Sequence, residues 1–243
     1  MKFFNTAGPV NCERHYCLDP LSRFDLDEIL MLIDQHKYFV LHAPRQTGKT
    51  TCMLALMKYL NQNGTTCLYI NVEGAQAMRE NVKESMRIIL SEVASRANTH
   101  LKNDFLETIW YDIFKQRSGF ALNHILTRWA EMDQQPKVLI IDEIDSLIGD
   151  TLISVLRQLR AGYDKRPYSF PQSVILCGVR DIRDYRIHSS AEKTIITGGS
   201  AFNIKAESLH LGHFFQKEVV QLYGYHTQET GQVFTENILI SGA

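Results

Sequence analysis

Residues 38–51 read YFVLHAPRQTGKTT, and this stretch decides the fold. Its first four residues are apolar and predict a short buried strand. The residues that follow are mostly polar or small and include Gly48, which predicts a turn. Apolar residues then recur at helical spacing from Met53 to Leu60, and Asn63-Gly64 is typical of the end of a helix. The stretch therefore predicts a strand, a tight turn and a helix in immediate succession.

The turn has the pattern of a phosphate-binding loop, GxxxxGK[ST], with Ala43 in place of the first glycine. Backbone N–H groups of such a loop surround a phosphate, and Gly48 lets the backbone approach it without a Cβ collision. Lys49 offers a cation to the phosphate oxygens, and Thr50 offers a hydroxyl to Mg²⁺. The helix that follows directs its positive end at the same place. The residues expected to bind the phosphates are Ala43, Pro44, Arg45, Gln46, Thr47, Gly48, Lys49, Thr50 and Thr51.

Ala43 is the one departure from the pattern. Its methyl group is harmless if φ at residue 43 is negative, and it costs about 1 kcal/mol or more if φ must be positive. The alternative interpretation is a strand–turn–helix that carries Gly-Lys-Thr by chance. The position of the motif between a predicted strand and a predicted helix favours the phosphate loop.

A second motif, VLIIDEIDSL, occupies residues 138–147. Its four apolar residues predict a buried strand that ends at Asp142, whose carboxylate can hold Mg²⁺ through water. Glu143 is the candidate general base for a water that attacks a γ-phosphate. Two adjacent carboxylates at a buried strand end are costly unless a cation faces them, and Mg²⁺ with Lys49 would supply that charge. The alternative is a solvated acidic turn after a core strand.

Strands and helices alternate along the rest of the chain. Such alternation predicts βαβ units, and hence an α/β fold with a parallel sheet covered by helices on both faces. Ligands of such sheets bind at the carboxyl ends of the strands, so we expect the chemistry just after Leu41, Ile141 and Cys177. Further strands are predicted at 67–70, 174–177 and within 202–211, and helices near 25–33, 78–93, 101–133, 152–159 and 214–229.

The composition argues against several classes of protein, namely nucleic-acid binders, membrane proteins and disulfide-rich secreted proteins. The 243 residues are 44% hydrophobic, and 26 basic against 27 acidic residues give a net charge of −1, so nothing in the bulk charge favours nucleic acid or an anionic membrane. No run approaches the ~18 apolar residues of a membrane helix, and the N-terminus turns polar before a signal peptide can form. Five scattered cysteines argue against a disulfide framework, and Cys12, His15 and Cys17 match no common zinc spacing. We therefore expect a cytoplasmic protein.

The two motifs, in this order, resemble those of the P-loop ATPases of the AAA+ and STAND type, in which Asp-Glu is followed by a second Asp, here Asp145. More narrowly, the chain resembles the bacterial AAA-like ATP-binding domain family at residues 38–50, 174–185 and 199–211. The resemblance extends from about Phe4 to Thr235. It implies a three-layer P-loop NTPase fold of the ASCE type, with a five-stranded parallel sheet whose fourth strand lies between the two motif strands. It also implies ATP with Mg²⁺ as ligands and Glu143 as the catalytic base.

Two features depart from this family. AAA+ proteins place a polar sensor at the end of the fourth strand, where this chain reads Cys177-Gly178-Val179-Arg180. Arg180 is the candidate to reach the γ-phosphate instead, and the alternative is a surface arginine. The family also carries a helical lid after the fifth strand, whereas this sequence has one predicted helix there. We therefore expect an N-terminal segment and helix at 1–37, an ATPase core at 38–211 and the start of a truncated helical segment at 212–243.

The expected function is Mg²⁺-dependent ATP binding, with hydrolysis of ATP to ADP and phosphate, in a regulatory or mechanochemical switch. The missing lid and sensor favour one alternative, a non-hydrolysing nucleotide-dependent protein-interaction module. A second alternative is a DNA-associated AAA+ ATPase, similar to the origin-recognition or transposition ATPases that share the Asp-Glu-x-Asp pattern. Separately, residues 157–193 contain eight Lys or Arg against four Asp or Glu. That basic segment could supply an arginine finger to a neighbouring copy, a nucleic-acid track through Arg183 and Arg186, or only a solvated face.

The partners expected from these patterns are ATP and either another protein or a second copy of the chain. The near-zero net charge counts against nucleic acid without excluding it, and no membrane partner is expected. Tyr16 and Arg23 precede the first strand, where ATPases of this type often place adenine contacts. We therefore regard both as candidates for binding the base.

Overall fold

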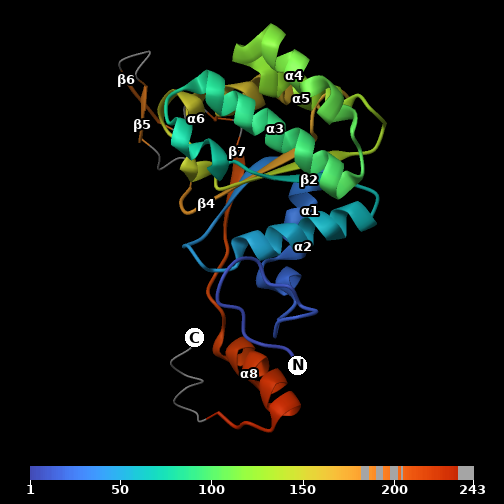
Figure 1. Cartoon of the computed structure of the whole chain (residues 1–243), viewed down its shortest axis with the longest axis vertical. Helices are drawn as coiled ribbons and strands as arrows, with labels where there is room; N and C mark the ends of the chain where they lie inside the picture. Colours follow the sequence, from blue (N-terminus) through green and yellow to red (C-terminus); the bar gives the residue numbers. More distant parts are fainter. Residues whose placement is uncertain (182–185, 190–193, 198–201, 204, 235–243) are drawn as a thin grey trace.

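A five-stranded parallel sheet forms the centre of the structure, a computed structural model that describes residues 1–181, 186–189, 194–197, 202–203 and 205–234. The strand order is β2-β3-β4-β1-β7, so β4 lies between the two strands that carry the motifs, as the family resemblance implied. The predicted α/β fold is confirmed (Figure 1). The strands are β1 (Tyr38–His42), β2 (Thr66–Asn71), β3 (Lys137–Asp142), β4 (Ser173–Gly178) and β7 (Lys205–His210).

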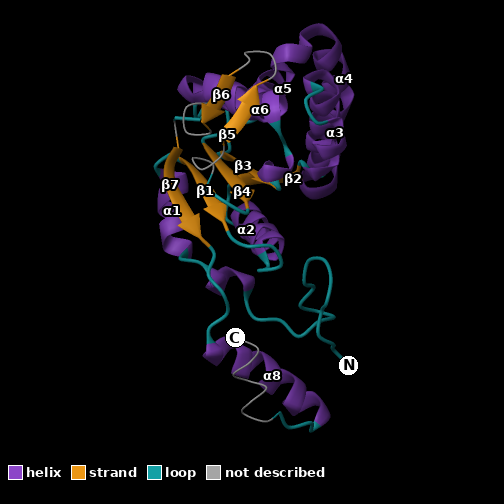
Figure 2. Ribbon diagram, turned by 90° about the vertical axis from the view of Figure 1, so that its left-hand side faces the viewer, coloured by secondary structure: helices purple, strands orange, loops and turns teal. Residues whose placement is uncertain are grey.

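Helices cover both faces of this sheet and make the fold three-layered (Figure 2). Helices α1 (Leu26–Asp34) and α2 (Lys49–Gln62) pack on one face, against Phe39 and Leu41 of β1. The opposite face, with Tyr38 and Val40, packs against α3, α5 and α6. Side chains alternate between the two faces of a strand, so a strand buried on both sides must be apolar throughout. The bounds of the second layer are α3 (Val82–Leu101), α5 (Ala121–Ala130) and α6 (Gly149–Ala161), with α4 (Phe105–Arg117) packed on α3.

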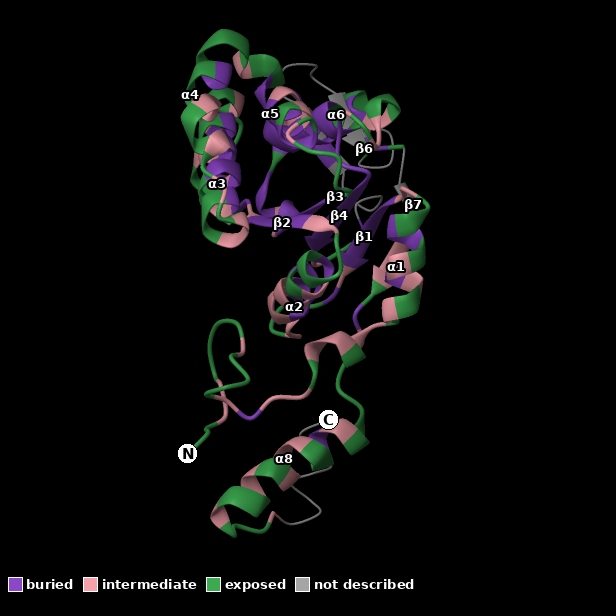
Figure 3. Ribbon diagram, turned by 90° about the vertical axis from the view of Figure 1, so that its right-hand side faces the viewer, coloured by how far each residue is buried: buried purple, intermediate pink, exposed green. Residues whose placement is uncertain are grey.

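Three strands, β2, β3 and β4, begin one residue before the apolar runs that predicted them. Ser173 and Lys137 are polar, yet both are buried in the sheet. The Lys137 ammonium donates to the Asp133 carboxylate and to the backbone carbonyl of Gln135, which satisfies its hydrogen bonds. Burial of the apolar strand residues, seen at the centre of Figure 3, stabilises the fold by roughly 1.5–3 kcal/mol for each large side chain.

The helix expected within residues 101–133 is present as α4 and α5, and the sequence did not predict the short 3-10 turn at Ser118–Phe120 that separates them. Lys102 ends α3 in the left-handed conformation, with φ of 54°. The sequence also did not predict the antiparallel hairpin of β5 (Arg186–Ser189) and β6 (Thr194–Thr197). Arg183, a candidate nucleic-acid contact, lies outside the described residues.

The N-terminal segment packs against the last helix, α8 (Gln216–Thr230), at the end of the molecule opposite α4 (Figure 1). The Tyr16 hydroxyl donates to the Glu229 carboxylate at 2.8 Å. The Phe4 ring contacts the rings of Tyr223 and His226, with centroids 5.2 and 5.3 Å away. These contacts join two segments that are remote in the sequence.

Cys12 and Cys17 form a disulfide in the same N-terminal segment. The scattered positions of the five cysteines argued against a disulfide framework. This bridge is local, with a separation of five residues, so it closes a small loop and is not a long-range framework. The three other cysteines are free and buried, as their apolar surroundings indicated for Cys67 and Cys177. Among the described residues, we find no helix that combines the length and the apolar character needed to cross a bilayer.

Candidate active site

The loop after β1 joins the carboxyl edge of the sheet to the N-terminus of α2. Gly48 has φ of 86° and precedes the first residue of α2, where a Cβ would strain the backbone. Gln46 also has a positive φ, 63°. Ala43 does not belong to the residues with positive φ, so a methyl group is tolerated at the position where the pattern has its first glycine. The departure from the pattern therefore leaves the loop conformation intact.

Lys49 is the first residue of α2 and is only 6% exposed. Its ammonium donates to the carbonyls of Ala43 and Pro44, at 2.9 and 3.1 Å. Among the ion pairs of the described residues, none includes Lys49. A nearly buried ammonium held only by neutral carbonyls is well suited to bind an anion, because it has given up hydration and still carries its charge.

Asp142, the last residue of β3, is fully buried. Its Oδ2 accepts hydrogen bonds from the hydroxyls of Thr50 and Tyr69, both at 2.8 Å. Its Oδ1 accepts the backbone N–H of Glu143 at 2.9 Å. The structure thus brings together the two residues predicted to hold Mg²⁺, Thr50 and Asp142, from β3 and from the helix after β1. The sequence did not indicate a role for Tyr69, because a tyrosine within an apolar strand looks like any other aromatic residue of the core.

Glu143 stands at the rim of the cavity described below, in the left-handed conformation with φ of 57°. Such a backbone is unfavourable for a residue with a Cβ and is common where a side chain must be directed into a site. Partial burial raises the pKa of the Glu143 carboxyl, as do the charges of Asp142 and Asp145, while Lys49 lowers it. A carboxylate with a raised pKa is a better general base than an ordinary one.

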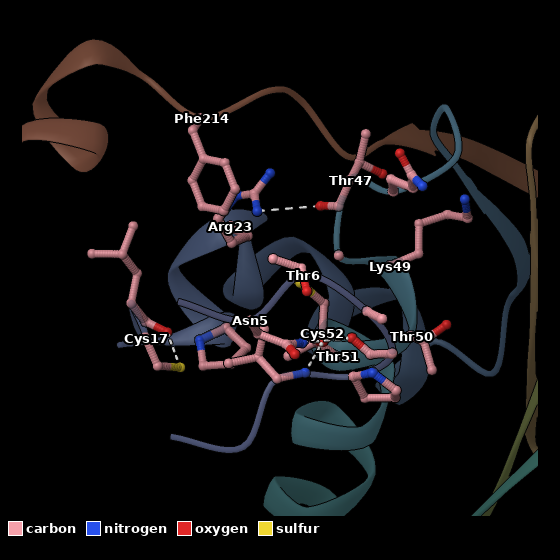
Figure 4. A pocket seen from close by; sticks show the side chains of 18 of the residues that line it. Asn5, Thr6, Cys17, Arg23, Thr47, Lys49, Thr50, Thr51, Cys52 and Phe214 are labelled. Carbon is pink, nitrogen blue, oxygen red and sulfur yellow. Dashed lines mark hydrogen bonds between the residues drawn. The ribbon is translucent and has the colours of Figure 1, made fainter. Parts of the chain in front are cut away.

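A cavity of about 740 Å³ opens over the loop (Figure 4). Its floor is the loop from Arg45 to Cys52, with Glu143 and Glu73 at the side. Its other wall comes from the N-terminal segment, including residues 4–10, and from Phe214 and Leu222 near and on α8. Figure 4 shows that the N-terminal segment lies beside the loop, and the N–H of Val10 donates to the Thr51 hydroxyl at 3.0 Å.

Arg23 connects three parts of this cavity. Its guanidinium donates to the carbonyl of Thr47 in the loop at 3.3 Å and to the carbonyl of Gly212 at 2.7 Å. It also lies 3.7 Å from the centroid of the Phe214 ring, a cation–π contact. Arg23 and Tyr16, the two candidates for contacting a base, both line the cavity. The contribution of Phe214 and of residues 4–10 was not predicted, because it depends on the packing of both ends of the described chain.

Arg180 lies apart from these residues. It is exposed and does not belong to the residues that line the cavity, so its contact with a γ-phosphate stays a prediction. The backbone beside it is connected to the second motif, since the N–H of Val179 donates to Asp145 at 3.2 Å. Asp145 thereby ties the end of β4 to the segment that follows β3.

Comparison with known proteins agrees with this geometry. The family described as AAA domain matches residues 33–185, more than half of the chain. The Walker-type ATPase of Pyrococcus abyssi is similar in structure, with a TM-score of 0.58 and 16% identity over 97% of this chain and 64% of its own. Cdc6p from Pyrobaculum aerophilum follows, with a TM-score of 0.50 and 15% identity over 84% of this chain and 48% of its own.

At these identities, the two structures show a common fold and no more. The chain spans less than two thirds of the length of either protein. No curated protein sequence matches it.

Proposed function

The chain belongs to the AAA domain family, and on this premise we propose that it is a nucleotide-binding ATPase that hydrolyses ATP to ADP and phosphate. The observation that carries the proposal is the meeting of both motifs at one edge of the sheet. Lys49, Thr50 and Glu143 line one cavity, and the buried Asp142 carboxylate lies directly behind Thr50, whose hydroxyl donates to it. These groups match the needs of phosphoryl transfer, which are a cation, a metal-binding pair and a base.

Each group has a role in this proposal. The loop N–H groups and Lys49 bind the β- and γ-phosphates, and the positive end of α2 favours the same charge. Glu143 orients and deprotonates the attacking water, which its raised pKa supports. Arg180 is retained as the candidate sensor of the γ-phosphate. The loop residues 43–51 remain the proposed phosphate-binding set.

The donor set fits Mg²⁺. Thr50 and Asp142 are oxygen donors in contact at 2.8 Å, and hard divalent cations prefer oxygen ligands. Asp142 is fully buried with only neutral hydrogen-bond donors, so a cation nearby would compensate its charge. We propose that these two residues hold Mg²⁺, which would neutralise charge on the phosphate oxygens when bound.

The cavity supports a nucleoside triphosphate rather than phosphate alone. Its volume of about 740 Å³ is in the range of sites for drug-sized ligands. Tyr16, Arg23 and Phe214 line the same cavity and offer flat and cationic groups to a base. We propose that the N-terminal segment, residues 1–37, and the described part of the C-terminal segment, residues 212–234, complete the nucleotide site of a core at 38–211.

The switch role, and partners other than nucleotide, are proposals of the same kind. Members of AAA-type families often self-associate or act on other proteins, and the exposed arginines at the end of α6, Arg157 and Arg160, are candidates for contact with a neighbouring copy.

Phosphate release from ATP by the purified chain tests the proposal. We expect turnover that needs Mg²⁺ and stops on addition of EDTA. Binding of Mg-ATP without any release of phosphate would instead favour the non-hydrolysing interaction module. Absence of both binding and release would contradict the proposed function.

A further inference from the structure

Tyr69 makes a contact that the two motifs do not include. Its hydroxyl donates to Asp142 Oδ2 at 2.8 Å, on the same oxygen that accepts the Thr50 hydroxyl. Tyr69 is 2% exposed and Asp142 is fully buried, so water does not compete for this hydrogen bond. We propose that Tyr69 is a positioning residue, which holds the Asp142 carboxylate in the orientation that binds the divalent cation. This inference rests on the function proposed above.

The sheet register explains why a tyrosine reaches this carboxylate. Tyr69 of β2 lies beside Ile140 of β3, and Asp142 lies two residues further along the same strand. Tyr69 and Ile140 belong to the apolar cluster under α2, which places Asp142 on that face as well, because residues two apart share a face. Two residues of a strand span about 6.6 Å, a distance that a tyrosine leaning along the strand can cover with its ring.

The Tyr69 hydroxyl is one of the donors that fix the orientation of the Asp142 carboxylate. A buried carboxylate without enough donors is costly and free to rotate. Thr50 also belongs to the loop that binds phosphate, so its hydroxyl must serve both the cation and Asp142. Tyr69 lies in the sheet core and does not line the cavity, so its hydroxyl does not have to bind the ligand as well as Asp142. It therefore keeps Oδ2 in place whether or not the loop moves.

A residue that only stabilises the fold would affect thermal stability and leave metal binding unchanged. The chain offers a matched control for this distinction. Tyr38 of β1 is also a buried strand tyrosine, and its hydroxyl donates to the carbonyl of Pro171 at 3.1 Å. Tyr38→Phe and Tyr69→Phe thus each remove one buried hydroxyl and leave the ring. Both should lower thermal stability, whereas only Tyr69→Phe should change the metal site.

The experiment measures Mn²⁺ binding by electron paramagnetic resonance in the presence of a non-hydrolysable ATP analogue. Loss of a group that orients a metal ligand typically weakens metal binding, and we expect the dissociation constant for Mn²⁺ to rise about tenfold to a hundredfold in Tyr69→Phe. Tyr38→Phe should bind Mn²⁺ like the unsubstituted chain. Binding of the analogue in EDTA should be the same in all three proteins. In an Asp142→Asn background, Tyr69→Phe should cause no further loss.

The possible outcomes separate this inference from the proposed function. Equal Mn²⁺ affinity of Tyr69→Phe and Tyr38→Phe would overturn the role of Tyr69 and leave the proposed function standing. No Mn²⁺ uptake by the unsubstituted chain with the analogue would contradict the proposed function and, with it, this inference. If Tyr69→Phe does not fold, 3-fluorotyrosine at residue 69 replaces it. Its ¹⁹F resonance should then move when Mg²⁺ is added with the analogue, and an unmoved resonance would overturn the inference.

Discussion

Replacing Lys49 by Ala removes the buried cation of the loop. The ammonium has three donors, and two of them go to the carbonyls of Ala43 and Pro44. At least the third N–H of the ammonium is therefore available to donate to a phosphate oxygen. The substitution takes away this donor and the charge, and it leaves the rest of α2 unchanged.

The expected loss follows from the strength of one charged hydrogen bond. A hydrogen bond to a charged group contributes about 1.5–3 kcal/mol, and about 1.4 kcal/mol corresponds to a tenfold change in affinity. Lys49 is only 6% exposed, so its contribution is not screened as that of a surface lysine would be. We expect Lys49→Ala to bind Mg-ATP about tenfold to a hundredfold more weakly than the unsubstituted chain.

Isothermal titration with Mg-ATP measures this loss, and Lys58→Ala is the control. Lys58 is on the same helix and is exposed, so its removal takes one positive charge from α2 without touching the loop. Lys58→Ala should bind Mg-ATP normally. If Lys49→Ala retained its affinity to within about twofold, or if Lys58→Ala lost as much, the assignment of Lys49 to the phosphates would be wrong.

Three further substitutions test contacts at the cavity and elsewhere in the fold. Arg23→Ala loses one hydrogen bond to the loop, one to Gly212 and the contact with Phe214. We expect this to weaken Mg-ATP binding by about 1 kcal/mol, roughly fivefold by titration. Gly162→Ala places a Cβ 2.4 Å from the Phe170 ring, and urea denaturation should show a loss of about 1–3 kcal/mol. The Tyr16 hydroxyl lowers the pKa of Glu229, so Tyr16→Phe should raise that pKa in a carboxyl NMR titration. The contact between Tyr16 and Glu229 is complete above the ordinary pKa of a glutamate and is lost as the pH falls through the lowered one.

Unchanged affinity in Arg23→Ala would remove Arg23 from the nucleotide site. Gly119→Ala serves as the control for Gly162, because a Cβ at Gly119 would meet no atom within 4 Å, and equal losses in both would contradict the steric argument. An unmoved Glu229 titration in Tyr16→Phe would show that the hydroxyl does not set that pKa.

The sequence predicted all five strands of the sheet and both motifs, because a parallel sheet buried on both faces requires apolar runs. The prediction from sequence was wrong where a polar residue is buried. Lys137 is buried at the start of β3, yet its residue type suggests a surface position. The hairpin of β5 and β6 was missed because both strands are short and lack an alternating apolar pattern, although the β-branched residues of Thr194–Thr197 favour a strand.

The site could be predicted only as far as its local motifs. The loop and Asp142-Glu143 are recognisable because each lies within a few residues of a strand end. Tyr69 and the wall of the cavity are not recognisable in this way. Their roles arise from strand register and from packing of the N-terminal segment near α8, which involve residues remote in the sequence.

Glu143→Gln is the decisive substitution for the proposal that this chain hydrolyses ATP at the site that joins the two motifs. The substitution keeps the size of the side chain and removes the base, while Lys49, Thr50 and Asp142 stay in place. Phosphate release and Mg-ATP binding should be measured on the same preparation. The account predicts normal binding with turnover reduced about a hundredfold or more. Undiminished phosphate release by Glu143→Gln would contradict it.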